Sequence, residues 1–70
     1  MNNTFDFQEA LSCIKADMPV CLNIDGKERK YFLNDKGEIM CTPNGKEHLT
    51  YKVKQFQIDA VMSREWKLCN

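Results

Sequence analysis

Apolar side chains recur at helical spacing near the start of the chain. Between residues 7 and 17 they fall three or four positions apart and share one face, as Phe7, Ala10, Leu11 and Ile14, with Met18 extending the row. Asp6 is placed to cap the first turn, and Glu9, three residues on, can complete a capping box. Pro19 disfavours helical backbone at the residue before it, so we predict that the helix ends near Asp17.

The apolar period changes to two after this helix, which is typical of half-buried strands. Turn signals rich in Gly, Asn, Asp and Pro divide the rest of the chain and predict strands at 20–24, 28–33, 38–42, 48–54 and 65–68. Residues 55–63 fit one helical turn, which Asp59 begins or caps. The turns lie too close together for crossover helices, so the strands should be antiparallel neighbours.

These elements predict an α+β fold with one domain, residues 1–70, in which an N-terminal helix packs on a four- or five-stranded antiparallel meander sheet. A chain this short has a small hydrophobic core and often depends on disulfide bonds or other covalent links, bound metals or a partner subunit for its stability. If Tyr31 and Leu33 face the helix, Phe32 must face the other side, as does Met40. We predict that Phe32 and Met40 form either an interface between copies of the chain or a patch beneath its final segment.

Ten basic and ten acidic side chains give a net charge of zero, which argues against a protein that binds nucleic acid mainly through its phosphates. The charge is uneven, because acids predominate in residues 1–26 and cations in residues 27–54. A small anionic ligand is therefore compatible with the middle segment. The sequence has neither an apolar run of membrane-spanning length nor a signal-peptide pattern at its start, so we expect a cytoplasmic protein with no membrane partner.

The four cysteines contain no C-x-x-C pair, which argues against a metal site. Without a signal for export we expect all four thiols to be free and mostly buried. A nucleophilic pair of a cysteine with His48, the one histidine, stays open as an alternative to a solvated histidine. Because no base, nucleophile and orienting group converge in the pattern, we predict no catalytic residues, no cofactor and no enzyme activity.

Cations stand beside aromatic residues in the middle of the chain. Arg29 and Tyr31 lie in the second predicted strand, and Tyr51 and Lys52 lie in the fourth. Rings can stack on a base while basic side chains hold a phosphate, so these four are the candidate ligand-binding residues. Each also has a structural interpretation, with Tyr31 in the core and the cations on solvated strand faces.

The ends of the chain resemble a known family. The run FQEALSCIK at 7–15 is similar to the opening helix F-x-E-A-L-x-x-(I/L)-K of the second Thoeris anti-defence family, and AVMSREWKL at 60–68 is similar to its closing segment around a tryptophan. The resemblance covers about a third of the chain and implies a phage-encoded homo-oligomer that sequesters a cyclic nucleotide immune signal without cleaving it. Where that family usually has Arg-x-Gly-Trp after the first strand, this chain has LNID at 22–25.

Two functions follow as hypotheses. The first is a phage-type sponge in the host cytoplasm that binds a small anionic, nucleotide-like ligand. The alternative is a small inhibitor or adaptor that binds a host protein through the Phe32 and Met40 face or through an exposed strand edge.

Overall fold

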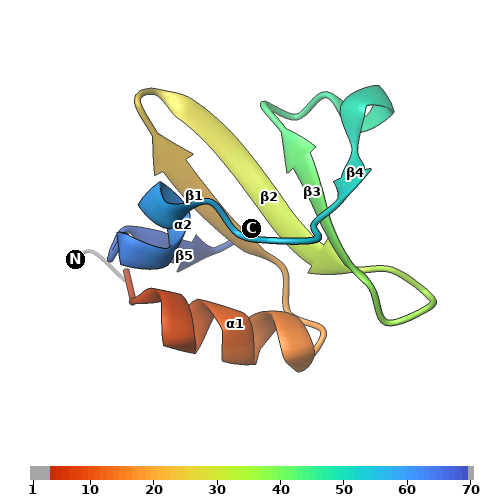
Figure 1. Ribbon diagram of the computed structural model, residues 1–70, viewed down its shortest axis with the longest axis horizontal. Coiled ribbons are helices and arrows are strands. Elements are labelled where there is room, and N and C mark those ends of the chain that lie inside the picture. The colour runs from red at the N-terminus through yellow and green to blue at the C-terminus, as the bar shows by residue number, and fades with distance from the viewer. Residues whose placement is uncertain (1–3, 70) are drawn as a thin grey trace.

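The computed structural model describes residues 4–69, which contain two α-helices, one short 3₁₀ helix and five strands (Figure 1). In chain order these elements are α1 (Phe7–Lys15), β1 (Val20–Ile24), β2 (Lys27–Leu33), β3 (Ile39–Pro43), η1 (Glu47–Leu49), β4 (Tyr51–Lys52), α2 (Ile58–Met62) and β5 (Trp66–Leu68). The predicted α+β class, with an N-terminal helix and an antiparallel sheet, is confirmed.

The five strands lie in the order β4-β3-β2-β1-β5, and every neighbouring pair is antiparallel. The first four form a meander, whereas β5 returns to the free edge of β1. Asp25 and Gly26 join β1 to β2 with φ values of 53° and 76°, the left-handed pair that a two-residue type I′ turn requires. Ile24 faces Lys27 directly across this turn, so the turn fixes the register of the hairpin.

Helix α1 begins as the sequence predicts and ends earlier. The Asp6 carboxylate accepts a hydrogen bond from the backbone N–H of Glu9 at 3.0 Å, and Ala10 and Ile14 are fully buried against the sheet. The helix stops at Lys15, ahead of Pro19. The expectation that Met18 extends the buried row is wrong, because the chain has already left the helix and the Met18 side chain is 43% exposed.

The predicted strand at 48–54 is wrong over most of its length. Glu47–Leu49 form the 3₁₀ helix η1, and only Tyr51–Lys52 join the sheet as β4. Leu49, an apolar residue of the predicted strand, is 50% exposed. The chain then leaves the sheet and crosses in front of β2 and β1 toward α2 (Figure 1), a path that packs Phe56 against the core. In this segment, packing of Phe56 on the core replaces further strand pairing, and the alternation of apolar residues alone does not indicate this path.

Helix α2 confirms the helical turn expected within 55–63. Asp59 lies in its first turn, while Gln57 occupies the N-cap position. Ala60 is fully buried in the core, but Ile58 and Met62 are 80% and 75% exposed. One face of α2 therefore closes the core and the opposite face presents apolar side chains to solvent.

Trp66 lies at the centre of the core and has no exposed surface. Its ring centroid lies 5.0 Å from that of Tyr31, 6.1 Å from that of Phe7 and 6.4 Å from that of Phe56. The indole N–H donates a hydrogen bond to the backbone carbonyl of Ala60 at 3.0 Å. Trp66 thus joins β5, α1, β2 and α2 in one cluster with its single polar atom satisfied.

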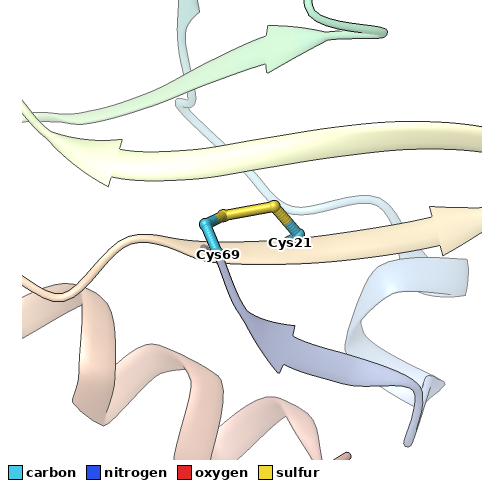
Figure 2. The surroundings of a disulfide bond; sticks show 2 residues. All are labelled: Cys21 and Cys69. Atoms are coloured by element: carbon cyan, nitrogen blue, oxygen red, sulfur yellow. A yellow bond between two sulfur atoms is a disulfide. The ribbon is translucent and has the colours of Figure 1, made fainter.

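The expectation that all four cysteines are free is wrong. Cys21 in β1 and Cys69, directly after β5, form a disulfide, while Cys13 and Cys41 are free (Figure 2). The pairing of β5 with β1 brings the two Cα atoms to 5.4 Å, within the range that a disulfide spans. The bonded residues are 48 positions apart, so spacing alone does not indicate the pairing.

Candidate ligand-binding site

A hollow of about 730 Å³ lies on the face of the sheet opposite to α1, which we call the open face. Val20 and Leu22 of β1 are buried toward the helix, so the intervening Cys21 points to the open face. The hollow is lined by side chains from four strands and from the loops around them, among them Cys21, Lys30, Phe32, Thr42, Lys67 and Cys69. Its volume lies within the range of roughly 300 to 1,000 Å³ that is usual for small-molecule sites.

Four of these side chains form one row across the sheet. Lys67 of β5 pairs with Cys21 of β1, Cys21 pairs with Lys30 of β2, and Lys30 pairs with Thr42 of β3. Directly opposed side chains in antiparallel strands have Cβ atoms about 4.5 to 5.5 Å apart. Two lysines therefore flank Cys21, one on each side, within the hollow.

The lysine charges in this row are not neutralised by direct ion pairs. The ion pairs found within residues 4–69 are Arg29 with Asp59 and Lys52 with Glu38, and neither involves Lys30 or Lys67. The Lys30 Nζ atom lies 5.8 Å from the centroid of the Phe32 ring, a cation–π contact that holds the amine beside an aromatic face. An anionic group with an attached ring could contact both side chains together.

Hydrogen-bonding groups complete the lining. Thr42 is 5% exposed, and its hydroxyl oxygen lies 2.7 Å from that of Thr50, which also lines the hollow. Three carboxylates line it as well, those of Asp17, Glu28 and Glu47. The three carboxylates outnumber the two lysines, so an anionic group of a ligand would bind at the lysines alone, while N–H or O–H donors of the same ligand would face the carboxylates.

The four ligand-binding residues expected from the sequence do not lie together. Arg29, Tyr31 and Tyr51 lie on the face toward α1, as their register with Leu22 and Cys41 requires. Lys52 lies in register with Met40 on the open face. The structure thus separates Lys52 from the other three.

Tyr31 has little surface with which to contact a ligand. It is 3% exposed, and its ring lies 5.3 Å from that of Phe56 and 5.0 Å from that of Trp66, measured between centroids. Burial raises the pKa of its hydroxyl. This is the structural role that the sequence left open for Tyr31.

Arg29 and Tyr51 lie beside Tyr31. Burial tends to lower the pKa of the Arg29 guanidinium, but Tyr31, Tyr51 and the Asp59 carboxylate outweigh it and leave the pKa raised. The Arg29 Nη1 atom lies 3.9 Å from Asp59 Oδ1, which ties β2 to α2. The neighbouring Cys41 thiol, followed by burial, raises the pKa of Tyr51 to about 12, so its hydroxyl stays neutral near pH 7.

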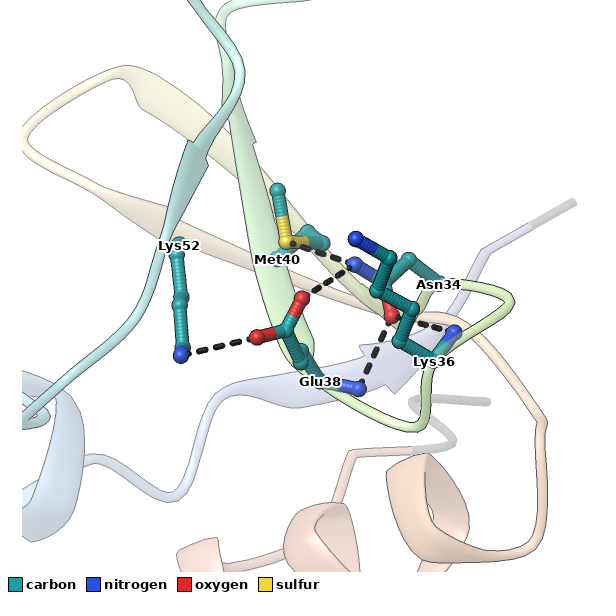
Figure 3. A network of polar contacts seen from close by, with 5 residues as sticks. All are labelled: Asn34, Lys36, Glu38, Met40 and Lys52. Atoms are coloured by element: carbon teal, nitrogen blue, oxygen red, sulfur yellow. Dashed lines mark hydrogen bonds and ion pairs between the residues drawn. The ribbon is translucent and has the colours of Figure 1, made fainter.

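Lys52 belongs to a polar network around the turn that joins β2 to β3 (Figure 3). Its Nζ atom lies 2.8 Å from Glu38 Oε2, and the Asn34 side-chain amide donates to Glu38 Oε1 at 3.0 Å. The Asn34 amide also lies 3.5 Å from the Met40 sulfur, while its carbonyl oxygen accepts from the backbone N–H groups of Lys36 and Glu38. These contacts stabilise the β2–β3 turn.

Phe32 and Met40, the expected interface residues, face each other across β2 and β3 and are half-buried on the open face. Phe32 lines the hollow, whereas Met40 contacts the Asn34 network. Their role in an interface between copies stays a prediction.

Neither Lys67 nor Lys30 is among the ligand-binding residues predicted from the sequence. A signal for Lys67 is present, because it follows the buried Trp66 and must point to the opposite side of β5. The pairing of β5 with β1, which brings both lysines beside Cys21, does not follow from the sequence pattern.

No family model, curated protein or solved structure matches this chain. Within residues 4–69, no three His, Cys, Asp or Glu side chains are grouped so that they could hold a metal ion. No helix in the same part of the chain has the length and apolar character needed to cross a membrane.

Proposed function

We propose that this protein is a non-catalytic binding protein that captures a small anionic, nucleotide-like ligand in the hollow of the open face. The observation that carries the proposal is the row of Lys67, Cys21, Lys30 and Thr42, with two lysines free of ion pairs within the described residues. A phosphate of the ligand would bind between Lys30 and Lys67, and its ring would stack on Phe32. Base N–H groups would donate to the carboxylates of the lining.

The same proposal includes the biological setting that the resemblance of the chain ends implies. The protein would be a phage-encoded sponge, acting as a homo-oligomer in the host cytoplasm and holding a cyclic nucleotide signal without cleaving it. Its stoichiometric action requires tight binding rather than turnover, which is compatible with the absence of a convergent nucleophile and base in the sequence pattern.

Thermal unfolding in the presence of candidate ligands tests this function. Cyclic dinucleotides, isomers of cyclic ADP-ribose and linear mononucleotides are added separately, because a ligand that binds only the folded state stabilises it by RT ln(1 + [L]/Kd). At a ligand concentration of about 100 Kd this stabilisation is about 2.7 kcal/mol. We expect at least one cyclic compound to raise the melting temperature.

Matched lysine variants test whether the ligand binds in the hollow. The double variant Lys30→Gln, Lys67→Gln should lose the ligand-dependent shift, whereas Lys54→Gln, which removes an exposed lysine outside the hollow, should keep it. Native mass spectrometry of the unmodified protein reads the subunit number and any retained ligand. A panel that leaves the melting temperature unchanged, or a shift that survives in the double variant, contradicts the proposed site.

A second candidate function, a small inhibitor or adaptor that binds a host protein, is favoured by the exposed apolar face of α2. Ile58 and Met62 are 80% and 75% exposed and lie one helical turn apart. If this face binds a partner, the protein should capture one stoichiometric host protein, and the variant Ile58→Asp, Met62→Asp should lose it while keeping its melting temperature. Capture that is unchanged in this variant contradicts the α2 surface as the binding site.

A further inference from the structure

The disulfide borders the hollow, and its Cys21 residue lies between the two lysines. Cys21 and Cys69 both line the hollow, and Cys21, which is 7% exposed, has Lys30 opposite it on one side and Lys67 on the other. Cys69, which directly follows β5 (Figure 2), is half-buried, whereas Cys21 is buried. Cys69 is therefore the more exposed residue of the disulfide for a reagent in the hollow.

This environment differs from that of the two free cysteines. Cys13 lies on α1, and Cys41 is paired with Tyr31 and Tyr51 in the ladder, without a cation directly opposite. Neighbouring lysines stabilise a thiolate relative to a thiol. The carboxylates that share the hollow, those of Asp17, Glu28 and Glu47, oppose this effect, but only Lys30 and Lys67 lie directly beside Cys21 in the ladder.

We propose that Cys21 and Cys69 form a thiol–disulfide exchange site for a small anionic thiol, whose carboxylates bind to Lys30 and Lys67 while its sulfur reacts at Cys69. The class of reagent is a low-molecular-weight thiol such as an acidic thiol-containing peptide. The exchange goes beyond the nucleotide-binding proposal and does not depend on it, because it requires only the disulfide and its flanking cations.

The reaction proceeds in two balanced steps. The thiolate of the reagent attacks the Cys69 sulfur, a bond forms between these sulfurs, and the bond between Cys69 and Cys21 breaks with its electron pair leaving on Cys21. Lys30 and Lys67 stabilise this Cys21 thiolate, and a better leaving group makes the exchange faster. A second thiolate attacks the reagent sulfur of the mixed disulfide and releases Cys69 as a thiolate. Two reagent thiols are thereby oxidised to one small disulfide, and the protein disulfide is reduced to two cysteines that take up protons from water.

The rate of exchange with thiols of different charge tests the proposal. The oxidised protein is mixed with glutathione, which is anionic, with neutral 2-mercaptoethanol or with cationic cysteamine, and the reaction is stopped by acid and read by mass spectrometry after alkylation. With rates normalised to the thiolate concentration, we expect glutathione to react about tenfold faster than cysteamine, because Lys30 and Lys67 lie directly beside Cys21 and attract an anionic reagent. The intact-mass spectrum should also show the mixed disulfide on Cys69.

Lysine variants separate the proposed cause from simple exposure of the disulfide. The preference for glutathione should disappear in Lys30→Gln, Lys67→Gln and persist in Lys54→Gln, with circular dichroism confirming that each variant is folded. Equal rates for all three thiols, an unreactive disulfide, or a preference that survives in the double variant would overturn the proposal. A protein that binds a nucleotide but shows one of these results retains the function proposed above and loses only this site.

A second measurement addresses the Cys21 thiolate directly. In Cys69→Ser the disulfide cannot form, and the thiolate absorbance of this protein minus that of Cys21→Ser, Cys69→Ser gives the titration of Cys21. We expect this midpoint to shift upward when Lys30 and Lys67 are replaced by Gln, because neighbouring lysines stabilise the thiolate. A midpoint that does not respond to the lysines contradicts their role.

Discussion

Replacing Trp66 tests whether the core depends on one side chain. The substitution Trp66→Ala removes a fully buried ring and one of the two hydrogen bonds that the Ala60 carbonyl accepts, the other coming from the backbone N–H of Ser63. Large-to-small replacement of a buried aromatic costs about 3 to 5 kcal/mol, and the loss of one hydrogen bond costs about 0.5 to 1.5 kcal/mol. Together these two losses predict a decrease in the free energy of unfolding of about 4 to 6 kcal/mol.

This loss is large compared with the stability of such a chain. At roughly 0.05 to 0.15 kcal/mol per residue, seventy residues have a free energy of unfolding of roughly 3.5 to 10 kcal/mol. Trp66→Ala should therefore be largely unfolded or unfold at very low urea concentration. Trp66→Phe keeps a ring in the cluster but loses the hydrogen bond to Ala60 and fills less of the core, so it should stay folded with a loss of about 1 to 3 kcal/mol.

The assay is urea denaturation followed by far-ultraviolet circular dichroism. Tryptophan fluorescence is unsuitable because Trp66 is the one tryptophan of the chain. The matched control is Met62→Ala, because Met62 is 75% exposed and surface substitutions usually change stability by less than about 0.5 kcal/mol. If the two Trp66 variants unfold at the same urea concentration as Met62→Ala, the core is not organised around Trp66 and the reasoning fails.

Three further perturbations have expected outcomes. Asp6→Ala should lower the free energy of unfolding by about 1 kcal/mol and Asp6→Asn by much less, measured by urea denaturation, because only alanine removes the cap of α1; equal losses would contradict the cap. Reducing the disulfide should lower the free energy of unfolding by about 4 kcal/mol, because the linked residues are 48 positions apart; an unchanged melting temperature in reductant would contradict this loop-entropy argument. The hydrogen bond from Asn34 and the Lys52 amine lower the pKa of Glu38, so its contribution to stability is present above the unfolded pKa and is lost as the pH falls through the lower folded pKa. In an NMR titration of the Glu38 carboxyl group, Lys52→Gln should raise the midpoint, and an unchanged midpoint would exclude the ion pair as a cause.

Local signals in the sequence predicted the elements whose structure is decided locally. Asp6 caps α1 as expected, and Asp25 with Gly26 forms the expected turn, because side-chain capping and left-handed backbone depend on a few adjacent residues. The predicted strand around Leu49 is wrong because this part of the chain forms η1 and then leaves the sheet, which allows Phe56 to pack on the core. Apolar alternation does not carry that information.

The candidate site was harder to predict than the fold. Arg29 and Tyr31 are close in sequence and suggest a ligand site, but both lie on the face toward α1, where the Tyr31 ring packs in the core. The lysines of the hollow come from β2 and β5, far apart in the chain, and share a row only because β5 pairs with β1. Long-range register, which a single sequence pattern does not specify, therefore determines the site.

The position of β5 has a consequence for the order of folding. The hairpins from β1 to β4 connect neighbouring segments, whereas β5 must find β1 across most of the chain, and such distant contacts form slowly because a long loop has to close. Yet β5 supplies Trp66, without which the meander has no filled interior. We therefore expect the hairpins to gain lasting structure only when β5 docks, in a single cooperative transition. The same docking of β5 brings Cys69 to Cys21. The disulfide would therefore form only after folding is complete, and its presence would distinguish folded molecules from incompletely folded ones.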